Sequence, residues 1–314
     1  MVAEEARRTA RRLSPVVPAS PSFDHFLAID WSGARGRHHK GIALGLCGQG
    51  TGAPELLAPP SRRGWSREEV LRYLREDLPA RTLVGLDLGI ALPFADAGAF
   101  FPGLAQSPDT ARALWARIEG ICEEDEDLGA NAFVDHPDFA PYFRRHGGRE
   151  GERFHLPGSD HRRGRLRVTE AAQARLGCKP YSNFNLVGAA QVGKSSLTGM
   201  RLLHRLTGTL PVWPIDPLPR SASLVCEIYT TLAAVAAGRR AGRAKITERG
   251  DLDTALAALG SLPRGETGPI DDHSADALLT SAWLRAAAAR RELWHPPELT
   301  PELATREGWT FGAL

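Results

Sequence analysis

Apolar residues gather in short runs along this chain, and several of these runs predict strands of one sheet. Residues 25–32 and 41–47 are apolar and β-prone, and the short polar link between them predicts a hairpin. Residues 82–88 form a near-continuous apolar run, which is typical of a strand covered on both faces. Another strand is predicted at 223–230, and a weaker one near 54–58.

Helical signals lie between and after these strands. Ser66, followed three residues later by Glu69, has the arrangement of a capping box and predicts a helix that ends near Leu78. Further helices are expected near 186–206, 231–240, 251–259 and from about 272 to 292. Strands and helices in this order predict an α/β fold, in which helices flank a mixed sheet.

Residues 95–220 depart from this order and are expected to form a large helical and loop insertion. They hold an acidic run at 123–127, a basic stretch from Arg144 to Arg167 and a Pro-rich segment at 211–219. The first 22 residues are rich in Arg, Ala and Pro and lack the apolar core of a signal peptide. We therefore expect a disordered tail at 1–22 and a single domain over 23–314.

The composition is that of an ordinary globular protein. Of the 314 residues, 42% are hydrophobic and 24% charged, and the formal net charge of +2 indicates neither a nucleic-acid nor a membrane partner. The four cysteines are far apart without zinc-site spacing, so we expect reduced thiols in a cytoplasmic protein. No apolar run approaches the ~18 residues of a membrane span.

A single carboxylate interrupts each of three apolar strands. These acids are Asp30, Asp87 and Glu227. A carboxylate inside a buried strand is unfavourable by several kcal/mol unless it is paired or binds a metal, so acids in this position suggest convergence on a cation. Structural alternatives are a turn acid for Asp30 or Asp87, a buried pair with an Arg for Asp87, and an ion pair with an Arg for Glu227.

A fourth acidic group, at 271–276, begins the last long helix. Asp272 and Asp276 are four residues apart and His273 and Asp276 three, so both pairs share a helix face. His273 is a candidate ligand or proton carrier. The alternatives are a helix cap for Asp272, a surface acid stabilised by the helix dipole for Asp276, and a solvent-facing side chain for His273.

The order of these features resembles the ribonuclease H-like superfamily, and within it the chain looks most like an uncharacterised family of predicted nucleases. The resemblance implies a ribonuclease H-like sheet and an acidic site that holds Mg²⁺ or Mn²⁺ and cleaves phosphodiester bonds. The residues that carry it are Ile29-Asp30-Trp31-Ser32-Gly33, Gly85 to Pro93, Glu227-Ile228-Tyr229, Asp272 to Leu278 and Glu307-Gly308-Trp309. The implied metal ligands are Asp30, Asp87, Asp272 and Asp276, and the implied catalytic residues are Asp30, Asp87, Glu227, His273 and Asp276.

Residues 188–195 provide a rival signal, because they match the P-loop pattern GxxxxGK[ST]. In such a loop, backbone N–H groups and the lysine, here Lys194, bind phosphates. A P-loop follows a buried strand, whereas residues 181–187 are few and polar. The alternative function is therefore an ATP- or nucleotide-binding protein that uses this loop, or a site like that of actin and the sugar kinases.

The basic stretch is a candidate nucleic-acid contact. Its arginines would follow a phosphate backbone, and Tyr142, Phe143 and Phe154 would stack on bases. The alternative is a solvated loop neutralised by the acidic run. A non-catalytic nucleic-acid-binding module is a third, weaker hypothesis. The arginines concerned are Arg144, Arg145, Arg149, Arg153, Arg162, Arg163, Arg165 and Arg167.

Overall fold

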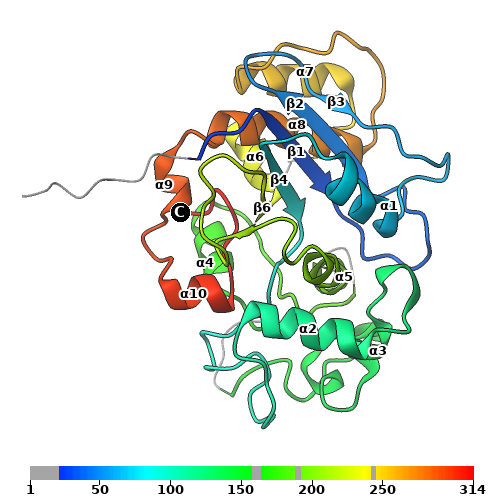
Figure 1. The fold of residues 1–314 in the computed structure, drawn as a ribbon, viewed down its shortest axis with the longest axis vertical. Helices are drawn as coiled ribbons and strands as arrows, with labels where there is room; N and C mark the ends of the chain where they lie inside the picture. Colours follow the sequence, from blue (N-terminus) through cyan, green and yellow to red (C-terminus); the bar gives the residue numbers. More distant parts are fainter. Residues whose placement is uncertain (1–20, 158–163, 188–191, 242–244) are drawn as a thin grey trace, which may run out of the picture.

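A mixed sheet of six strands forms the centre of the fold (Figure 1). The computed structural model describes residues 21–157, 164–187, 192–241 and 245–314. The tail expected at 1–22 lies almost wholly outside these ranges. The strands are β1 His25–Asp30, β2 Ala43–Gly48, β3 Glu55–Leu56, β4 Thr82–Asp87, β5 Val212–Trp213 and β6 Leu224–Glu227. Across the sheet they follow the order β3-β2-β1-β4-β6-β5.

The first strand joins the antiparallel and parallel halves of the sheet. β1 pairs antiparallel with β2, which confirms the predicted hairpin, and β2 pairs antiparallel with β3. On its other side β1 pairs parallel with β4, and β6 and β5 continue the parallel half. The β1–β4 register places Asp30 beside Asp87 at the carboxyl ends of both strands. Open α/β sheets bind their ligands at such strand ends.

Helices cover both faces of the sheet (Figure 1). On one face lie α1 Arg67–Arg72, α2 Ala111–Ile121 and α5 Val192–Arg205. On the other face, α8 Asp272–Ala287 packs directly on β1 and β2, and α6 Thr230–Ala236 and α7 Arg249–Ala258 pack on α8. The remaining short helices are α3 Asn131–Asp135, α4 Val168–Arg175, α9 Arg291–Trp294 and α10 Pro301–Arg306. Within the described ranges, no helix is long and apolar enough to span a membrane.

Alternation along β1 decides which way its terminal acid points. Successive side chains of a strand face opposite sides of the sheet. Leu27 and Ile29 belong to the core beneath α1, α2 and α5, whereas Phe26 and Ala28 belong to the core beneath α8. Asp30 continues the second series. The period of two therefore directs its carboxylate toward the start of α8.

The predicted capping box is confirmed. The Ser66 hydroxyl accepts a hydrogen bond from the Glu69 N–H at 3.1 Å, and the Glu69 carboxylate accepts one from the Ser66 N–H at 2.7 Å. The helix that follows is regular only to Arg72 and then widens into a π-type turn over Tyr73–Asp77. The expected end near Leu78 holds for the two segments together.

The insertion differs from its predicted form in two places. It was expected to contain no strand, but its Pro-rich segment provides β5, a two-residue edge strand that pairs with β6. Prolines before and after this strand keep it short, and edge positions tolerate proline. Helix α5 begins at Val192 rather than near 186, and Asn185 forms an isolated parallel bridge with Arg144.

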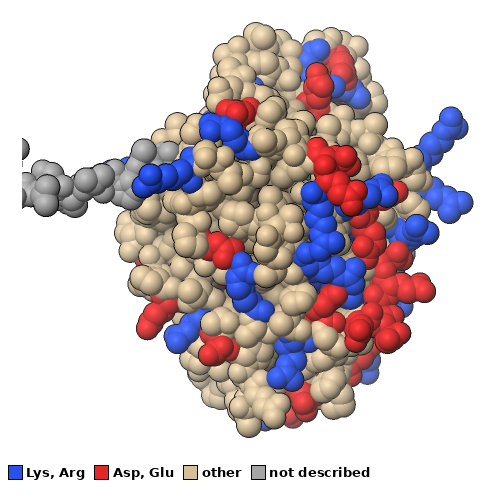
Figure 2. Space-filling view, viewed as in Figure 1, with Lys and Arg blue, Asp and Glu red and all other residues tan. Residues whose placement is uncertain are grey.

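Within the described residues, the basic stretch does not form a continuous track. Tyr142, Phe143 and Phe154 are at most 1% exposed within the core, so they cannot stack on bases and that part of the prediction was wrong. Arg165 and Arg167 are also buried and ion-paired. Arg162 and Arg163 lie outside the described residues. On the face shown in Figure 2, basic and acidic side chains are interspersed.

Residues 307–311, the C-terminal segment, return to the sheet beside β6. The Phe311 N–H donates to the Glu227 carbonyl at 2.8 Å. The Glu307 carboxylate accepts from the Phe94 N–H at 2.6 Å, the Ala95 N–H at 2.7 Å and the Val168 N–H at 2.9 Å. One buried acid thus holds three backbone segments together.

Candidate active site

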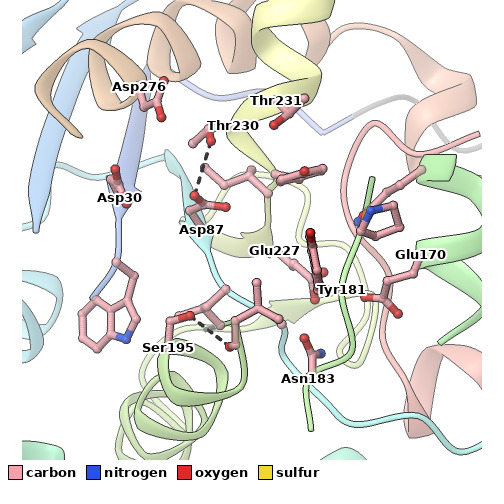
Figure 3. A pocket seen from close by; sticks show the side chains of 18 of the residues that line it. Asp30, Asp87, Glu170, Tyr181, Asn183, Ser195, Glu227, Thr230, Thr231 and Asp276 are labelled. Carbon is pink, nitrogen blue, oxygen red and sulfur yellow. Dashed lines mark hydrogen bonds between the residues drawn. The ribbon is translucent and has the colours of Figure 1, made fainter. Parts of the chain in front are cut away.

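A cavity of about 440 Å³ opens at the carboxyl ends of β1, β4 and β6 (Figure 3). The ends of these strands, the beginnings of α6 and α8, and the segment before α5 enclose it. Its location is the one that the strand-end acids predicted. The Asp and Glu residues that line it are Asp30, Asp87, Glu170, Glu227, Asp272 and Asp276.

Asp30 and Asp87 meet because their strands are parallel and in register. Burial raises the pKa of Asp30, which is only 8% exposed. The pKa of Asp87 is raised well above its usual value by burial and by the negative charges of Asp30 and Asp276. The Thr230 hydroxyl donates a long hydrogen bond to Asp87 Oδ2 at 3.4 Å. The two strand acids therefore repel each other at a partly desolvated strand edge.

The start of α8 supplies the remaining acids, and Asp271 rather than Asp272 caps the helix. The Asp271 side chain accepts from the Ser274 N–H at 2.9 Å. Asp272 pairs instead with Lys245, whose hydrogen bond lowers the pKa of this acid. Asp276 lies one turn further along. Burial, Asp30 and Asp272 raise the pKa of Asp276 to about 7.

His273 adds a positive charge to the acidic end of the cavity. Its Nδ1 lies 2.9 Å from Asp30 Oδ2, and this hydrogen bond raises the pKa of His273 to about 9. The imidazole is therefore protonated at neutral pH and donates to Asp30. Its side chain is 44% exposed, so the ring is held by Asp30 but remains accessible. The structure thus brings Asp30, Asp87, His273 and Asp276 together, as predicted.

Glu227 lines the same cavity but has the contacts of the structural alternative. Arg167 donates to both of its carboxylate oxygens, at 2.6 and 2.8 Å. Oε2 also accepts from the Ile90 N–H at 2.8 Å, and Oε1 from the Thr310 hydroxyl. Arg167 bonds Glu170 as well. Glu227 is thus part of a buried network that joins β6 to α4 and to the C-terminal segment.

The acids fit a hard divalent cation. No three His, Cys, Asp or Glu side chains among the described residues stand close enough to hold an ion in their present positions. Mg²⁺ needs fewer than three protein ligands, because it keeps several water molecules and binds one or two carboxylates. Burial raises the pKa values of Asp30, Asp87 and Asp276, and neighbouring carboxylates add to the shift, so a bound cation would favour their ionised forms. These three carboxylates are the ones that would hold Mg²⁺ or Mn²⁺, whereas the fourth predicted ligand, Asp272, is paired with Lys245.

The P-loop match at 188–195 falls partly outside the described residues, since 188–191 are among those left out. The Gly193 N–H, which a P-loop would direct at phosphate, donates to the Asn185 carbonyl at 3.0 Å. Lys194 lines a different cavity, of about 580 Å³, beside the acidic run. The described part of this loop therefore provides no phosphate cradle.

Several lining residues were not anticipated from the sequence: Lys179, Tyr181, Thr230 and Lys245. For the two lysines, the sequence contained a feature that could have indicated their role. Only four lysines occur in a chain rich in Arg, and two of them line this cavity. The sequence contained no such feature for Tyr181 and Thr230, because only the tertiary fold brings them close to the acids.

We expect the ionisation of Asp276 to destabilise the protein in the absence of metal. Its pKa is about 7 in the fold and 3.8 in the unfolded reference, so the folded state binds the proton more tightly. The contribution of Asp276 to stability is therefore present below pH 4 and is lost as the pH rises to about 7. The free energy of unfolding of Asp276→Asn should equal that of wild type at pH 4 and exceed it by about 1–3 kcal/mol at pH 8. Urea unfolding in EDTA across this range measures the difference, and equal stability at pH 8 would show that Asp276 is well solvated.

Comparison with protein family models, with curated proteins and with solved structures found no match to this chain.

Proposed function

We propose that this chain is a metal-dependent phosphodiester hydrolase, a nuclease of the ribonuclease H-like type. The observation that carries the proposal is the convergence of Asp30, Asp87 and Asp276 on one cavity, where burial and neighbouring carboxylates raise their pKa values. Perturbed acids in a cavity are characteristic of functional sites. The order of hairpin, helix, acid-bearing parallel strand and late acidic helix is consistent with the ribonuclease H-like sheet.

Each residue has a distinct part in this proposal. Asp30, Asp87 and Asp276 hold Mg²⁺ or Mn²⁺, which when bound would offset the charge of the phosphodiester and stabilise the leaving oxygen. Asp30 also orients His273 through the 2.9 Å hydrogen bond. The protonated, accessible imidazole attracts the anionic substrate and can donate a proton to the leaving oxygen. Arg167 and Glu227 form the rigid floor beneath these groups.

Metal binding should stabilise the protein in a pH-dependent way. At pH 8 Asp276 is mainly ionised, because its pKa is about 7, and a concentration of Mn²⁺ a hundredfold above the Kd should raise the free energy of unfolding by about 2.7 kcal/mol. At pH 5 Asp276 is protonated, so the gain should shrink sharply. Thermal unfolding with and without Mn²⁺ at both pH values measures this.

The same purified protein should cleave single-stranded, duplex or branched DNA or RNA with Mn²⁺; failure on all of them would refute the proposal.

A further inference from the structure

The wall of the cavity away from Asp30 carries an exposed tyrosine (Figure 3). Tyr181 is 38% exposed. In the part of the chain that the structure describes, it is the one aromatic residue among the large apolar side chains that are exposed; the others are Leu56, Leu176 and Leu262. An isolated exposed apolar residue needs no explanation. Tyr181 differs because it lines the cavity that contains the acids.

Positive charge accompanies this ring. Lys179, two residues before Tyr181, is exposed and lines the cavity, whereas Lys245 lies near the start of α8 and is paired with Asp272. Lysine is a flexible point charge that binds phosphate oxygens. A half-buried second tyrosine, Tyr229, lies close enough to Tyr181 for the two phenols to influence each other. Aromatic faces beside cationic groups are the combination that binds unpaired nucleotides.

The dimensions of the cavity restrict what can reach the acids. Its volume of about 440 Å³ is in the range of small-molecule pockets. Asp30 is recessed, since it is 8% exposed, and Asp87 is half-buried. A nucleotide inside an intact duplex presents its phosphate on a convex surface that does not enter such a space. Enzymes that act in recessed pockets take an unpaired nucleotide or unstack one.

We propose that the cavity accepts one unpaired nucleotide unit, with its base stacked on Tyr181 and a phosphate bound by Lys179. The substrate is therefore single-stranded nucleic acid or an unpaired end, rather than the interior of a duplex. This inference rests on the proposed function, because it assumes that the scissile phosphate, a different one from the phosphate at Lys179, is directed toward Asp30 and Asp87.

Binding without metal tests this inference separately from cleavage. Fluorescence anisotropy in EDTA at pH 6 should measure the Kd of wild type for a short fluorescein-labelled single strand, for a blunt duplex of the same sequence and for a labelled mononucleotide. Tyr181→Ala should weaken single-strand binding by about 5- to 150-fold, the effect of one lost base stack. Tyr181→Phe, which keeps the ring, should bind as wild type does. Lys179→Ala should lower the slope of log Kd against log salt by about 0.7.

Leu176→Ala is the matched control, since Leu176 is 39% exposed in the same segment and does not line the cavity. It should leave binding unchanged. If the single strand binds more tightly than the mononucleotide, nucleotides next to the one in the cavity also contact the protein. If the two bind equally, the protein recognises a single nucleotide unit. Wild-type affinity in Tyr181→Ala, preference for the duplex, or no binding of any nucleic acid would overturn the inference. Metal-dependent cleavage of duplex alone would overturn it while leaving the proposed function intact.

Discussion

Replacement of Asp87 by Asn should strongly impair cleavage and also stabilise the protein. Asp87 lies close enough to Asp30 and Asp276 for both negative charges to act on it, and burial together with these charges raises its pKa well above the usual value. Asn keeps the shape and removes the charge. Loss of one preorganised charged group in an active site typically lowers kcat by about 10²–10³-fold. The same change relieves repulsion, so at pH 8 in EDTA we expect a gain in unfolding free energy of about 1–3 kcal/mol.

The pH dependence of that gain identifies its cause. At pH 4 the wild-type carboxyl is protonated in the fold, so the stability difference between Asp87→Asn and wild type should vanish. Asp109→Asn is the control for total charge, because Asp109 is exposed and outside the cavity. It should change neither cleavage nor stability. Wild-type cleavage by Asp87→Asn would remove Asp87 from the proposed site.

Replacement of Arg167 by Ala should produce the largest loss of stability. Arg167 is 2% exposed and bonds the carboxylates of Glu170 and Glu227 and the Glu307 carbonyl. Removal of one partner from a buried ion pair leaves uncompensated charge and typically destabilises by about 3–5 kcal/mol. Chemical denaturation at pH 7 measures the change. Arg149→Ala, an exposed arginine from the same basic stretch, should stay within about 0.5 kcal/mol of wild type.

A second substitution distinguishes lost charge balance from lost packing. Addition of Glu227→Gln to Arg167→Ala removes a stranded carboxylate and should restore part of the stability, so the two changes should be non-additive. If Arg167→Ala and Arg149→Ala lose the same unfolding free energy, the buried ion-pair network of Arg167 does not stabilise the protein. For Glu227→Gln alone, the loss of unfolding free energy should exceed the rise in activation free energy calculated from kcat. This comparison distinguishes the structural contacts of Glu227 from its predicted catalytic role.

Local patterns were sufficient to indicate much of the sheet and three of the acids. Strand character places Asp30 and Asp87 at the ends of β1 and β4, and helical periodicity places Asp276 on the same helix face as His273. Once two strands are parallel, their carboxyl ends meet at one edge. The position of these acids therefore depends on short-range features that a single sequence contains.

The remaining features depend on long-range partners. Glu227 has the same apolar surroundings in sequence as Asp87, but its environment is set by Arg167, sixty residues away in the chain. The arginines of the basic stretch divide between buried and exposed positions according to the packing of the insertion. Strand β5 is too short for any periodicity and exists because β6 offers it an edge. Tyr181 reaches the cavity through the same tertiary packing.

The docking of residues 307–311 also has a consequence for biosynthesis. A chain leaves the ribosome from its N-terminus, so Asp30 and Asp87 emerge long before α8 brings Asp276 and before Glu307 and Thr310 complete the floor of the cavity. An incomplete nascent chain therefore lacks the assembled acid cluster. In the nuclease that we propose, this order would keep the acid cluster incomplete, and the messenger and ribosomal RNA safe from cleavage, until α8 and residues 307–311 have been synthesised.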